Sequence, residues 1–461
     1  MRKPIENDPF ASPKGNFRGH DQQSVWTQQP DPELTEIGPG TPCGEYLRRF
    51  WMPVAMTDQV TDLPYRLRIL GEDLVLFREK KEGKLGLTHL HCCHRNMSLE
   101  FGIVEDGGIR CSYHGWKYGL DGTILETPCE PPASQVKKKA CLGAYPVIEY
   151  KGLAFAYMGP AREQPPFPVM DTFDEDGDEL VPYLIKSPCN WLQVMENAWD
   201  PFHVVYLHTL AVRSQFIDAF AEMPMIEFHD SATGDFYTNV RRVGDIVWVR
   251  IHDHMLPSFT QNGGHFPVPD GSRYFGRCGL SRWITPIDDT NTMVIAWRHF
   301  RDAAANDDPK GLTDKSKVGY GMTDFYGQDP DRPYERRQRD PGDYDAWVSQ
   351  GPRNIHAREN LSFTDRGVAK ARRLLRNAIR ALQKGKRPPQ PGDAFPDREI
   401  PTYAGDTMLR VPLQEGRDDG AVLKEISHQV AEIYKSGDHL QGDARKAFLV
   451  EALKEYEASW R

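Results

Sequence analysis

The sequence predicts an α+β fold in which a small antiparallel β domain precedes a larger domain of helices and antiparallel strands. Two patterns in the chain indicate this. From about residue 65 to 157, short alternating apolar runs are separated by Gly and Asp, as in a small antiparallel sheet. From 185 to about 400, longer strand-like runs follow a segment of helical period at 191–210. A chain of 461 residues is long enough for two or three such domains.

Changes of composition along the chain predict its divisions. The polar segment 302–341 is rich in Pro and Asp and is expected to be a long loop. Segment 368–384 is expected to be a basic amphipathic helix with its charges in solvent. The expected divisions are an irregular arm at 1–34, the small β domain at 35–160, a Pro-rich and then acidic linker at 161–184, the larger domain at 185–400, and a C-terminal helical extension at 401–461.

Charge and hydropathy exclude several classes of partner. The formal net charge is −9, and the 57 basic and 66 acidic residues are interspersed, which argues against nucleic acid and anionic membrane as partners. No window approaches 18 consecutive apolar residues, and the chain begins with a polar segment. We therefore expect a cytoplasmic protein without a membrane anchor. Eight cysteines in a chain of this size indicate reduced thiols rather than a disulfide scaffold.

Two loops between short strand-like runs each carry one Cys and one His. Cys92 and His94 form a Cys-x-His pair, and Cys111 and His114 form a Cys-x-x-His pair. A structural zinc site is one interpretation of two thiolates and two imidazoles. The other is a Rieske [2Fe–2S] cluster, with Cys92 and Cys111 on one iron and His94 and His114 on the other. The mixed pair in each loop favours the cluster, because zinc fingers usually pair Cys with Cys and His with His.

A second set of metal-binding residue types lies in the segment of helical period. On a regular helix, Glu196, Asp200 and His203 share a face, whereas His208 lies about 140° round from His203. The two histidines can share a metal only if the helix is broken or has a π-type bulge, and Pro201 stands where it would help. Two His and a carboxylate are the facial triad of non-haem Fe(II) oxygenases.

These motifs resemble those of the Rieske non-haem iron oxygenases, specifically the oxygenase (alpha) component of the phthalate dioxygenase-like group. One departure is Cys93, where many relatives have Pro. The resemblance covers about residues 35 to 380 and implies a Rieske domain at 35–160 and a catalytic mononuclear iron domain of helix-grip type at 185–400. It also implies a homotrimer or hexamer. The resembling runs are His94-Arg95, Ser98-Leu99 and Cys111-Ser112-Tyr113-His114-Gly115-Trp116.

The resemblance also implies roles for particular residues. His203 and His208 would bind the mononuclear iron, and Asp200 would link that iron to the cluster. The third iron ligand would be Asp343, because the stretch 343–352 is similar to the one that carries this ligand in the phthalate dioxygenase-like group. Asp345 remains a competitor, since the choice depends on a backbone direction that sequence does not give.

The implied activity is the oxidation of an aromatic carboxylic acid with O2, by ring dihydroxylation or by monooxygenation such as O-demethylation. The chain has no G-x-G-x-x-G unit, flavin motif or plant-type cluster motif, so electrons from NAD(P)H would come through a separate reductase or a ferredoxin. Two alternatives stay open, a zinc hydrolase with Glu196 as base and a non-catalytic electron carrier. Any carboxylate anchor is expected among six arginines, most of them at the surface: Arg241, Arg242, Arg250, Arg273, Arg277 and Arg282.

Overall fold

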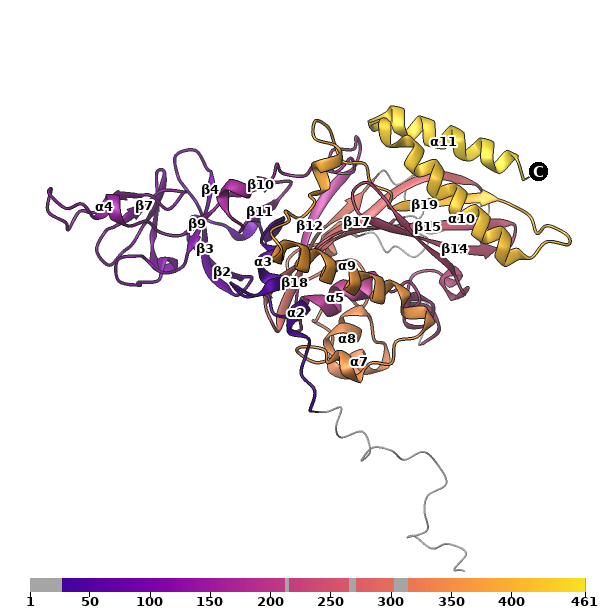
Figure 1. Ribbon diagram of the computed structural model, residues 1–461, viewed down its shortest axis with the longest axis horizontal. Helices are drawn as coiled ribbons and strands as arrows, with labels where there is room; N and C mark the ends of the chain where they lie inside the picture. The colour runs from indigo at the N-terminus through magenta and orange to yellow at the C-terminus, as the bar shows by residue number, and fades with distance from the viewer. Residues whose placement is uncertain (1–26, 212–214, 265–270, 302–313, 461) are drawn as a thin grey trace, which may run out of the picture.

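The structure is a computed structural model and describes residues 27–211, 215–264, 271–301 and 314–460. The molecule is elongated, with a small β-rich lobe at one end and a large lobe at the other (Figure 1). The small lobe contains strands β1 to β11, and the large lobe contains β12 to α11. The predicted α+β fold is therefore confirmed.

Three antiparallel sheets form the small lobe. Strand β1 (Trp51–Met56) pairs with β11 (Leu153–Tyr157), which pairs with β10 (Val147–Tyr150). A second sheet has the order β2 (Tyr65–Ile69), β3 (Glu72–Arg78), β4 (Leu85–His89) and β9 (Ala144–Tyr145). The third consists of β5 (Ile103–Glu105), β6 (Gly108–Arg110), β7 (Lys117–Tyr118) and β8 (Ile124–Glu126), and it lies at the far end of the lobe (Figure 1).

One antiparallel sheet forms the centre of the large lobe. Its order is β12 (Glu179–Ser187), β18 (Asn291–Phe300), β17 (Arg273–Asp288), β16 (Phe259–Gly263), β15 (Ile246–Met255), β14 (Asp235–Val243) and β13 (Met225–Asp230), and β19 (Gly405–Arg410) pairs with both β15 and β17. The expected linker at 161–184 thus includes the start of β12. The expected extension at 401–461 supplies β19 to the sheet, so it is not a purely helical addition.

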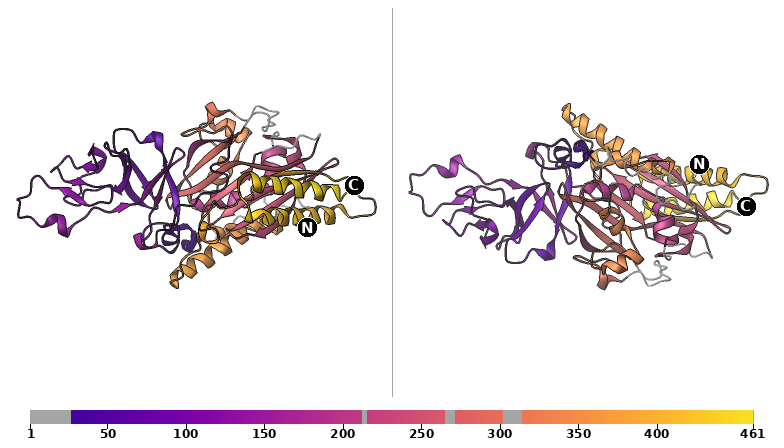
Figure 2. Two further views of the ribbon diagram at one scale, coloured as in Figure 1. Left: turned by 90° about the horizontal axis from the view of Figure 1, so that it is seen from above. Right: turned by 90° about the horizontal axis from the view of Figure 1, so that it is seen from below.

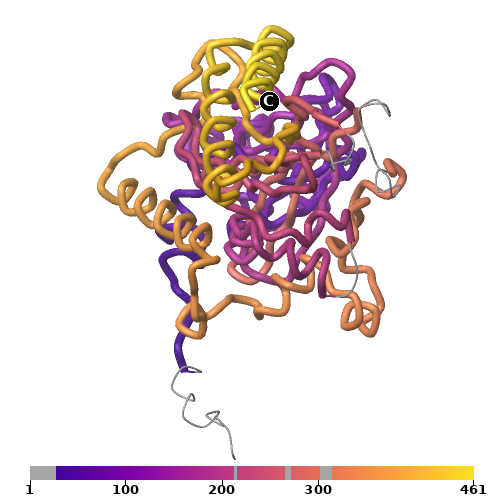
Figure 3. The backbone as a smooth tube through the Cα atoms, turned by 90° about the vertical axis from the view of Figure 1, so that its right-hand side faces the viewer, coloured from indigo at the N-terminus to yellow at the C-terminus, as the bar shows by residue number. Residues whose placement is uncertain are grey.

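The two faces of this sheet have different neighbours because side chains alternate along a strand. On β15, Val247, Val249 and Ile251 belong to an apolar core shared with the last two helices. These helices are α10 (Asp419–Ser436) and α11 (Gly442–Ala458), and they lie over one face of the sheet (Figures 2 and 3). Arg250 and His252 of β15 instead line a cleft on the opposite face.

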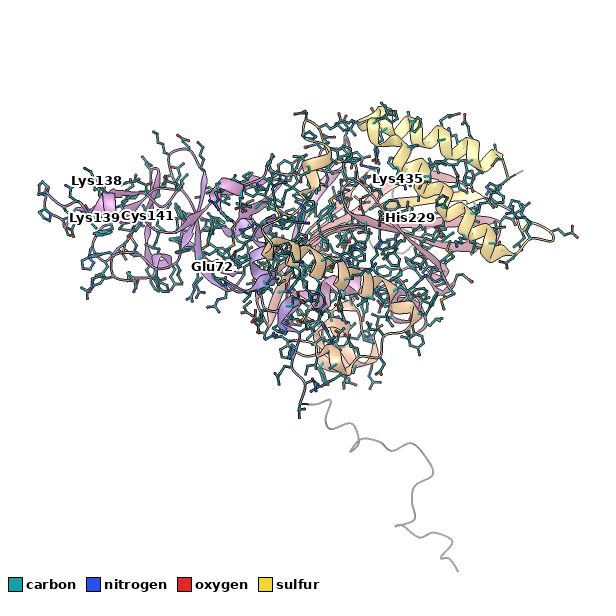
Figure 4. The ribbon with its side chains drawn as sticks, in the orientation of Figure 1. Glu72, Lys138, Lys139, Cys141, His229 and Lys435 are labelled. Carbon is teal, nitrogen blue, oxygen red and sulfur yellow. The ribbon has the colours of Figure 1, made fainter. Side chains whose placement is uncertain are left out.

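The C-terminal helices cover the sheet closely along their length. His229 on β13 lies near Lys435 on α10 (Figure 4), and the Lys435 charge contributes, after burial, to a lowered pKa of about 4 for His229. The two helices contact β13, β14, β15 and β17 on this face, and the opposite face carries the cleft.

Two helices hold the N-terminal segment in place. Helices α2 (Pro32–Thr35) and α3 (Pro42–Leu47) pack against α9 (Arg366–Gln383), and α2 also contacts α5 (Trp191–Ala198). Helix α5 further contacts α8 (Asp343–Val348), which follows α7 (Tyr334–Arg339) in the chain. The expectation that the charges of α9 face solvent holds for Arg373 and Arg380, which are exposed, but not for Arg372, which pairs with Glu196 and Glu359. Arg376 pairs with Glu33 at 2.5 Å and with Asp31, and Arg380 pairs with Glu33 at 2.6 Å.

The expected long loop at 302–341 is only partly covered by the structure. Residues 302–313 lie outside the described residues, and the remainder contains the helix α7, which the polar composition did not predict. None of the helices in the described residues is long and apolar enough to cross a membrane.

Candidate metal centres

Two loops of matching conformation carry the four residues predicted to bind the cluster. In the first, the Cys92 N–H donates to the carbonyl five residues later at 2.9 Å, and the Cys92 carbonyl accepts from the Asn96 N–H at 2.9 Å. The second loop repeats both bonds from Cys111, at 2.8 Å and, from the Gly115 N–H, at 3.0 Å. Asn96 and Gly115 have φ of 59° and 73°, the left-handed conformation that both turns require.

The two loops bring the thiols together inside and the imidazoles together outside. Cys92 and Cys111 are each 2% exposed, and burial together with the adjacent Cys92 side chain raises the pKa of the Cys111 thiol. The rings of His94 and His114 are 4.6 Å apart between centroids, and His94 stacks on Trp116 at 4.4 Å. The buried Nδ1 of His94 has no hydrogen-bond partner among the described residues.

This arrangement fits a [2Fe–2S] cluster with two thiolates on the inner iron and two imidazoles on the outer iron. The buried, unpartnered ring nitrogen is the group that a metal ion would satisfy. One further donor lies beside the thiols. The Tyr118 hydroxyl is 2.9 Å from the Cys92 Sγ and 3.5 Å from the Sγ of the half-buried Cys93.

The predicted distortion of the second motif is confirmed. Helix α5 ends at Ala198, four residues without helical structure follow, and the chain resumes as α6 (His203–Val205) and the π-helical turn η5 (Tyr206–Leu210). Pro201 lies in the break, and the π turn carries His208 round to the side of His203. The two imidazole centroids are 5.2 Å apart.

His203, His208 and Asp343 form a compact group in which the potential ligand atoms lie within 4.8 Å of one another. One oxygen of Asp343 is 3.4 Å from the His203 Nε2 and 3.2 Å from the His208 Nε2. Burial opposes ionisation of Asp343, but the two histidines outweigh it and hold its pKa well below the usual range. Two imidazoles and an ionised carboxylate on one side of an open cleft fit a mononuclear Fe(II) site.

The competing carboxylates point elsewhere. Asp345 pairs with Arg332 at 2.6 Å and with Arg337 at 2.5 Å. Glu196, which the helical wheel placed beside Asp200, instead forms a two-pronged ion pair with Arg372 of α9, at 2.5 and 2.8 Å. Glu196 therefore does not lie beside the two histidines, and it is not placed to act as the general base of a zinc hydrolase.

Asp200 lies between the His203 ring and the surface. Its Oδ2 is 3.6 Å from the His203 Nδ1, its Oδ1 accepts from the Phe202 N–H at 2.9 Å, and its side chain is 29% exposed. Burial raises the pKa of Asp200, but the contact with His203 lowers it more, so the pKa lies below its usual value. Asp200 thus shapes the turn at Pro201 and also keeps one carboxylate oxygen near the His203 ring.

Three residues that hold the triad in place were not predicted. The His208 Nδ1 is 2.8 Å from the Gln215 Oε1, which favours a tautomer with Nε2 free for a metal. Asn197 donates to Asp343 at 3.2 Å, and Gln328 donates to its other oxygen. Gln215 and Gln328 carry no sequence signal, whereas Asn197 sits one helical turn from Asp200 and was within reach of the helical argument.

The three triad residues line a cleft with an empty volume of about 890 Å³, open solvent at its mouth included. Aromatic side chains form much of its wall, among them Phe216, Phe220 and Phe325. The expectation that most of the six arginines lie at the surface was wrong. Four are buried, with exposed fractions from 0 to 9%: Arg241, Arg250, Arg277 and Arg282.

Comparisons with known proteins agree with this architecture. Residues 50–146 match the Rieske [2Fe-2S] domain family. The chain is 40% identical to the tert-butanol monooxygenase / tert-amyl alcohol desaturase oxygenase subunit of Aquincola tertiaricarbonis, over 99% of each chain. It is 37% identical to the phenoxybenzoate dioxygenase subunit alpha of Ectopseudomonas oleovorans, over 78% of this chain and 87% of the relative. The crystal structure of dicamba monooxygenase bound to 3,6-dichlorosalicylic acid shares the fold, with a TM-score of 0.56 and 16% identity over 74% of this chain and 99% of that one.

Fold, domain match and relatives together define an oxygenase component that joins an iron–sulfur domain to a catalytic iron domain. The zinc hydrolase and the pure electron carrier are not favoured. The chain belongs to the Rieske non-haem iron oxygenases, as an oxygenase (alpha) component of the group that includes phthalate dioxygenase.

Proposed function

We propose that His203, His208 and Asp343 bind the mononuclear Fe(II) of this oxygenase. The observation that carries the proposal is the compact triad at a cleft, supported from behind by Gln215 and Gln328. When bound, the Fe(II) would supply O2 activation with electrons delivered from the cluster. Gln215 orients the His208 ring, the two histidines hold the Asp343 carboxylate ionised, and aromatic side chains form a wall for the substrate.

Cys92 and Cys111 bind one iron of the [2Fe–2S] cluster in this proposal, and His94 and His114 bind the other. Electrons from NAD(P)H reach the cluster through a separate reductase or a ferredoxin. The names of several relatives support this arrangement, because they are given as oxygenase subunits of larger systems.

Asp200 carries the coupling between the two centres, and the coupling crosses a subunit boundary in a homotrimer or hexamer. Within one chain, the β5–β8 sheet that holds the second cluster loop lies at the end of the molecule away from the large sheet (Figure 1). A partially exposed carboxylate beside His203 is suited to accept an N–H from a cluster histidine of a neighbouring chain.

The substrate we propose is an aromatic carboxylic acid, oxidised by ring dihydroxylation or by O-demethylation. Aromatic walls in the cleft and the names of relatives that act on phenoxybenzoate, phthalate and dehydrodivanillate support this class. A tertiary alcohol is the second candidate, because the relative named for tert-butanol is 40% identical over almost the whole chain.

The test of the metal assignment combines metal analysis with turnover. The purified protein should contain iron and acid-labile sulfide, show reducible [2Fe–2S] absorption, and consume O2 when reduced through an added reductase in the presence of substrate. Zinc in place of iron, or a reducible cluster without mononuclear iron and without O2 consumption, would contradict the proposal.

A further inference from the structure

Arg282 is a buried cation in the cleft for which the described residues supply no ion-pair partner. It is 9% exposed and lines the cleft that contains the triad. No hydrogen bond or ion pair joins it to another residue in the described part of the chain, and its Nε is buried without a partner. An isolated buried charge is costly, so such a group is expected to have a partner that is not part of the chain.

The other two arginines of the cleft are already neutralised. Arg250 pairs with Asp406 at 3.2 Å and donates to the Gly263 carbonyl at 2.6 Å. Arg298 pairs with Asp324 at 3.2 Å and donates to the Gly279 carbonyl at 2.7 Å. These two guanidiniums are therefore parts of the wall, and Arg282 differs from both in having no carboxylate.

The strand register surrounds Arg282 with groups that are also unsatisfied. Arg282 on β17 lies opposite Thr260 on β16, and Thr260 lies opposite His254 on β15. The Thr260 Oγ1, the His254 Nε2 and the Asn262 Oδ1 are all buried without a partner among the described residues. Neighbouring strands are about 4.8 Å apart. Asn262 lines the cleft together with Arg282, whereas Thr260 and His254 line a separate small pocket beside it.

The two histidines near Arg282 neither add a charge of their own nor neutralise the guanidinium. Burial, followed by the charges of Arg282 and Lys370, lowers the pKa of His254 to about 3, so this ring is neutral at ordinary pH. Burial and nearby cations, Arg282 among them, also hold the pKa of His252 well below its usual value. The charge of Arg282 is thus available to a ligand in the cleft.

We propose that Arg282 binds the carboxylate of the substrate and determines that this oxygenase prefers anionic over neutral substrates. A guanidinium matches a carboxylate with two parallel N–H donors. The aromatic wall then receives the apolar body of the substrate. This inference rests on the proposed function and selects the aromatic acid over the tertiary alcohol.

The experiment measures binding of defined probes to the full-length, iron-containing protein without turnover. Benzoate and 3-phenoxybenzoate are compared with their primary amides, which have the same shape but no charge, and with tert-butanol. The wild-type protein should bind each acid about 10- to 100-fold more tightly than its amide, the range expected for a charge-assisted hydrogen-bonded pair. Arg282→Met should abolish this ratio and leave the affinity for the amides unchanged.

Two controls separate a ligand anchor from a structural residue. Arg242→Met makes the same substitution on β14, at a residue that pairs with Asp419 of α10 and does not line the cleft, and it should keep the wild-type ratio. The melting temperature of the ligand-free Arg282→Met protein should stay equal or rise, because an uncompensated buried charge has been removed.

The inference is overturned if wild-type protein binds acids and amides equally, if tert-butanol is the only probe that binds, if no probe binds, or if Arg282→Met keeps the preference. A melting temperature several degrees lower in Arg282→Met would also overturn it, by assigning Arg282 a structural role. Failure of the proposed function is seen separately, as absence of mononuclear iron or of substrate-dependent O2 consumption.

Discussion

The hydrogen bond between Tyr118 and Cys92 should raise the reduction potential of the cluster. The hydroxyl lies 2.9 Å from the Cys92 sulfur in a buried setting, and burial raises the pKa of Tyr118, so the phenol keeps its proton and acts as the donor. Reduction adds negative charge to the cluster and strengthens such a bond. Hydrogen bonds to cluster sulfurs are one of the main determinants of the potential.

The size of the effect follows from the energy of the bond. A hydrogen bond to a charged group is worth about 1.5–3 kcal/mol, and only the part that changes on reduction alters the potential. If that part is about 1 kcal/mol, Tyr118→Phe should lower the potential by about 40–50 mV, since a tenfold change in a one-electron equilibrium corresponds to about 59 mV.

The assay is a redox titration followed by the visible absorption of the cluster, with the mononuclear iron removed so that one centre titrates. Tyr113→Phe is the matched control, because Tyr113 lies in the second cluster loop but is 55% exposed and stacks against Arg95. Its potential should equal that of the wild type. An unchanged potential in Tyr118→Phe with an intact cluster, or an equal fall in both variants, would refute the reasoning.

Three further predictions concern single carboxylates. Asp343→Ala should lose the mononuclear iron and turnover but keep the cluster absorption, whereas Asp345→Ala should keep the iron, because Asp345 pairs with two arginines instead; metal analysis of both variants decides between them. Asp200→Asn should keep both metals and substrate binding, but with substrate and O2 present its reduced cluster should be reoxidised orders of magnitude more slowly. A wild-type rate of reoxidation, followed by stopped-flow absorption, would limit the role of Asp200 to shaping the turn. Glu79 accepts four backbone N–H groups from two turns of the small lobe, at 2.5–3.3 Å, and these bonds outweigh burial and lower its pKa from 4.5 to about 2. Glu79→Gln should therefore reduce the free energy of unfolding by about 1–3 kcal/mol at neutral pH. In thermal melts, the difference from wild type should shrink as the pH falls from 4.5 towards 2, because the ionised form of Glu79 is lost. A pH-independent difference would contradict this.

Local sequence was sufficient to predict the class and the family, because the chemistry of each loop is encoded over a few residues. Cys92 and His94 are two residues apart, and Cys111 and His114 are three apart, so a single tight turn brings each pair to one cluster. The motif with His203 and His208 is local as well. Two imidazoles five residues apart can share a metal only on a distorted helix, so their spacing already predicts the distortion. Strand periodicity likewise indicated the α+β fold, which depends on local alternation.

Tertiary structure alone decided which distant side chains meet. Asp343 and Asp345 are both acidic and lie two residues apart, yet only the direction of α8 brings the first to the histidines and the second to Arg332 and Arg337. Glu196 shared a predicted face with Asp200, but α5 ends at Ala198 and Arg372 of α9 pairs with the Glu196 carboxylate.

The arginines of the cleft are a second case in which the sequence could not predict which side chains meet. Arg250 and Arg282 are indistinguishable in sequence, since each lies in an alternating strand. Strand pairing places Asp406 of β19 opposite Arg250, whereas Arg282 receives Thr260 and Ala296 as its neighbours. Whether a buried charge has a counter-charge depends on the register between strands that are far apart in the chain, and local pattern carries no information about that register.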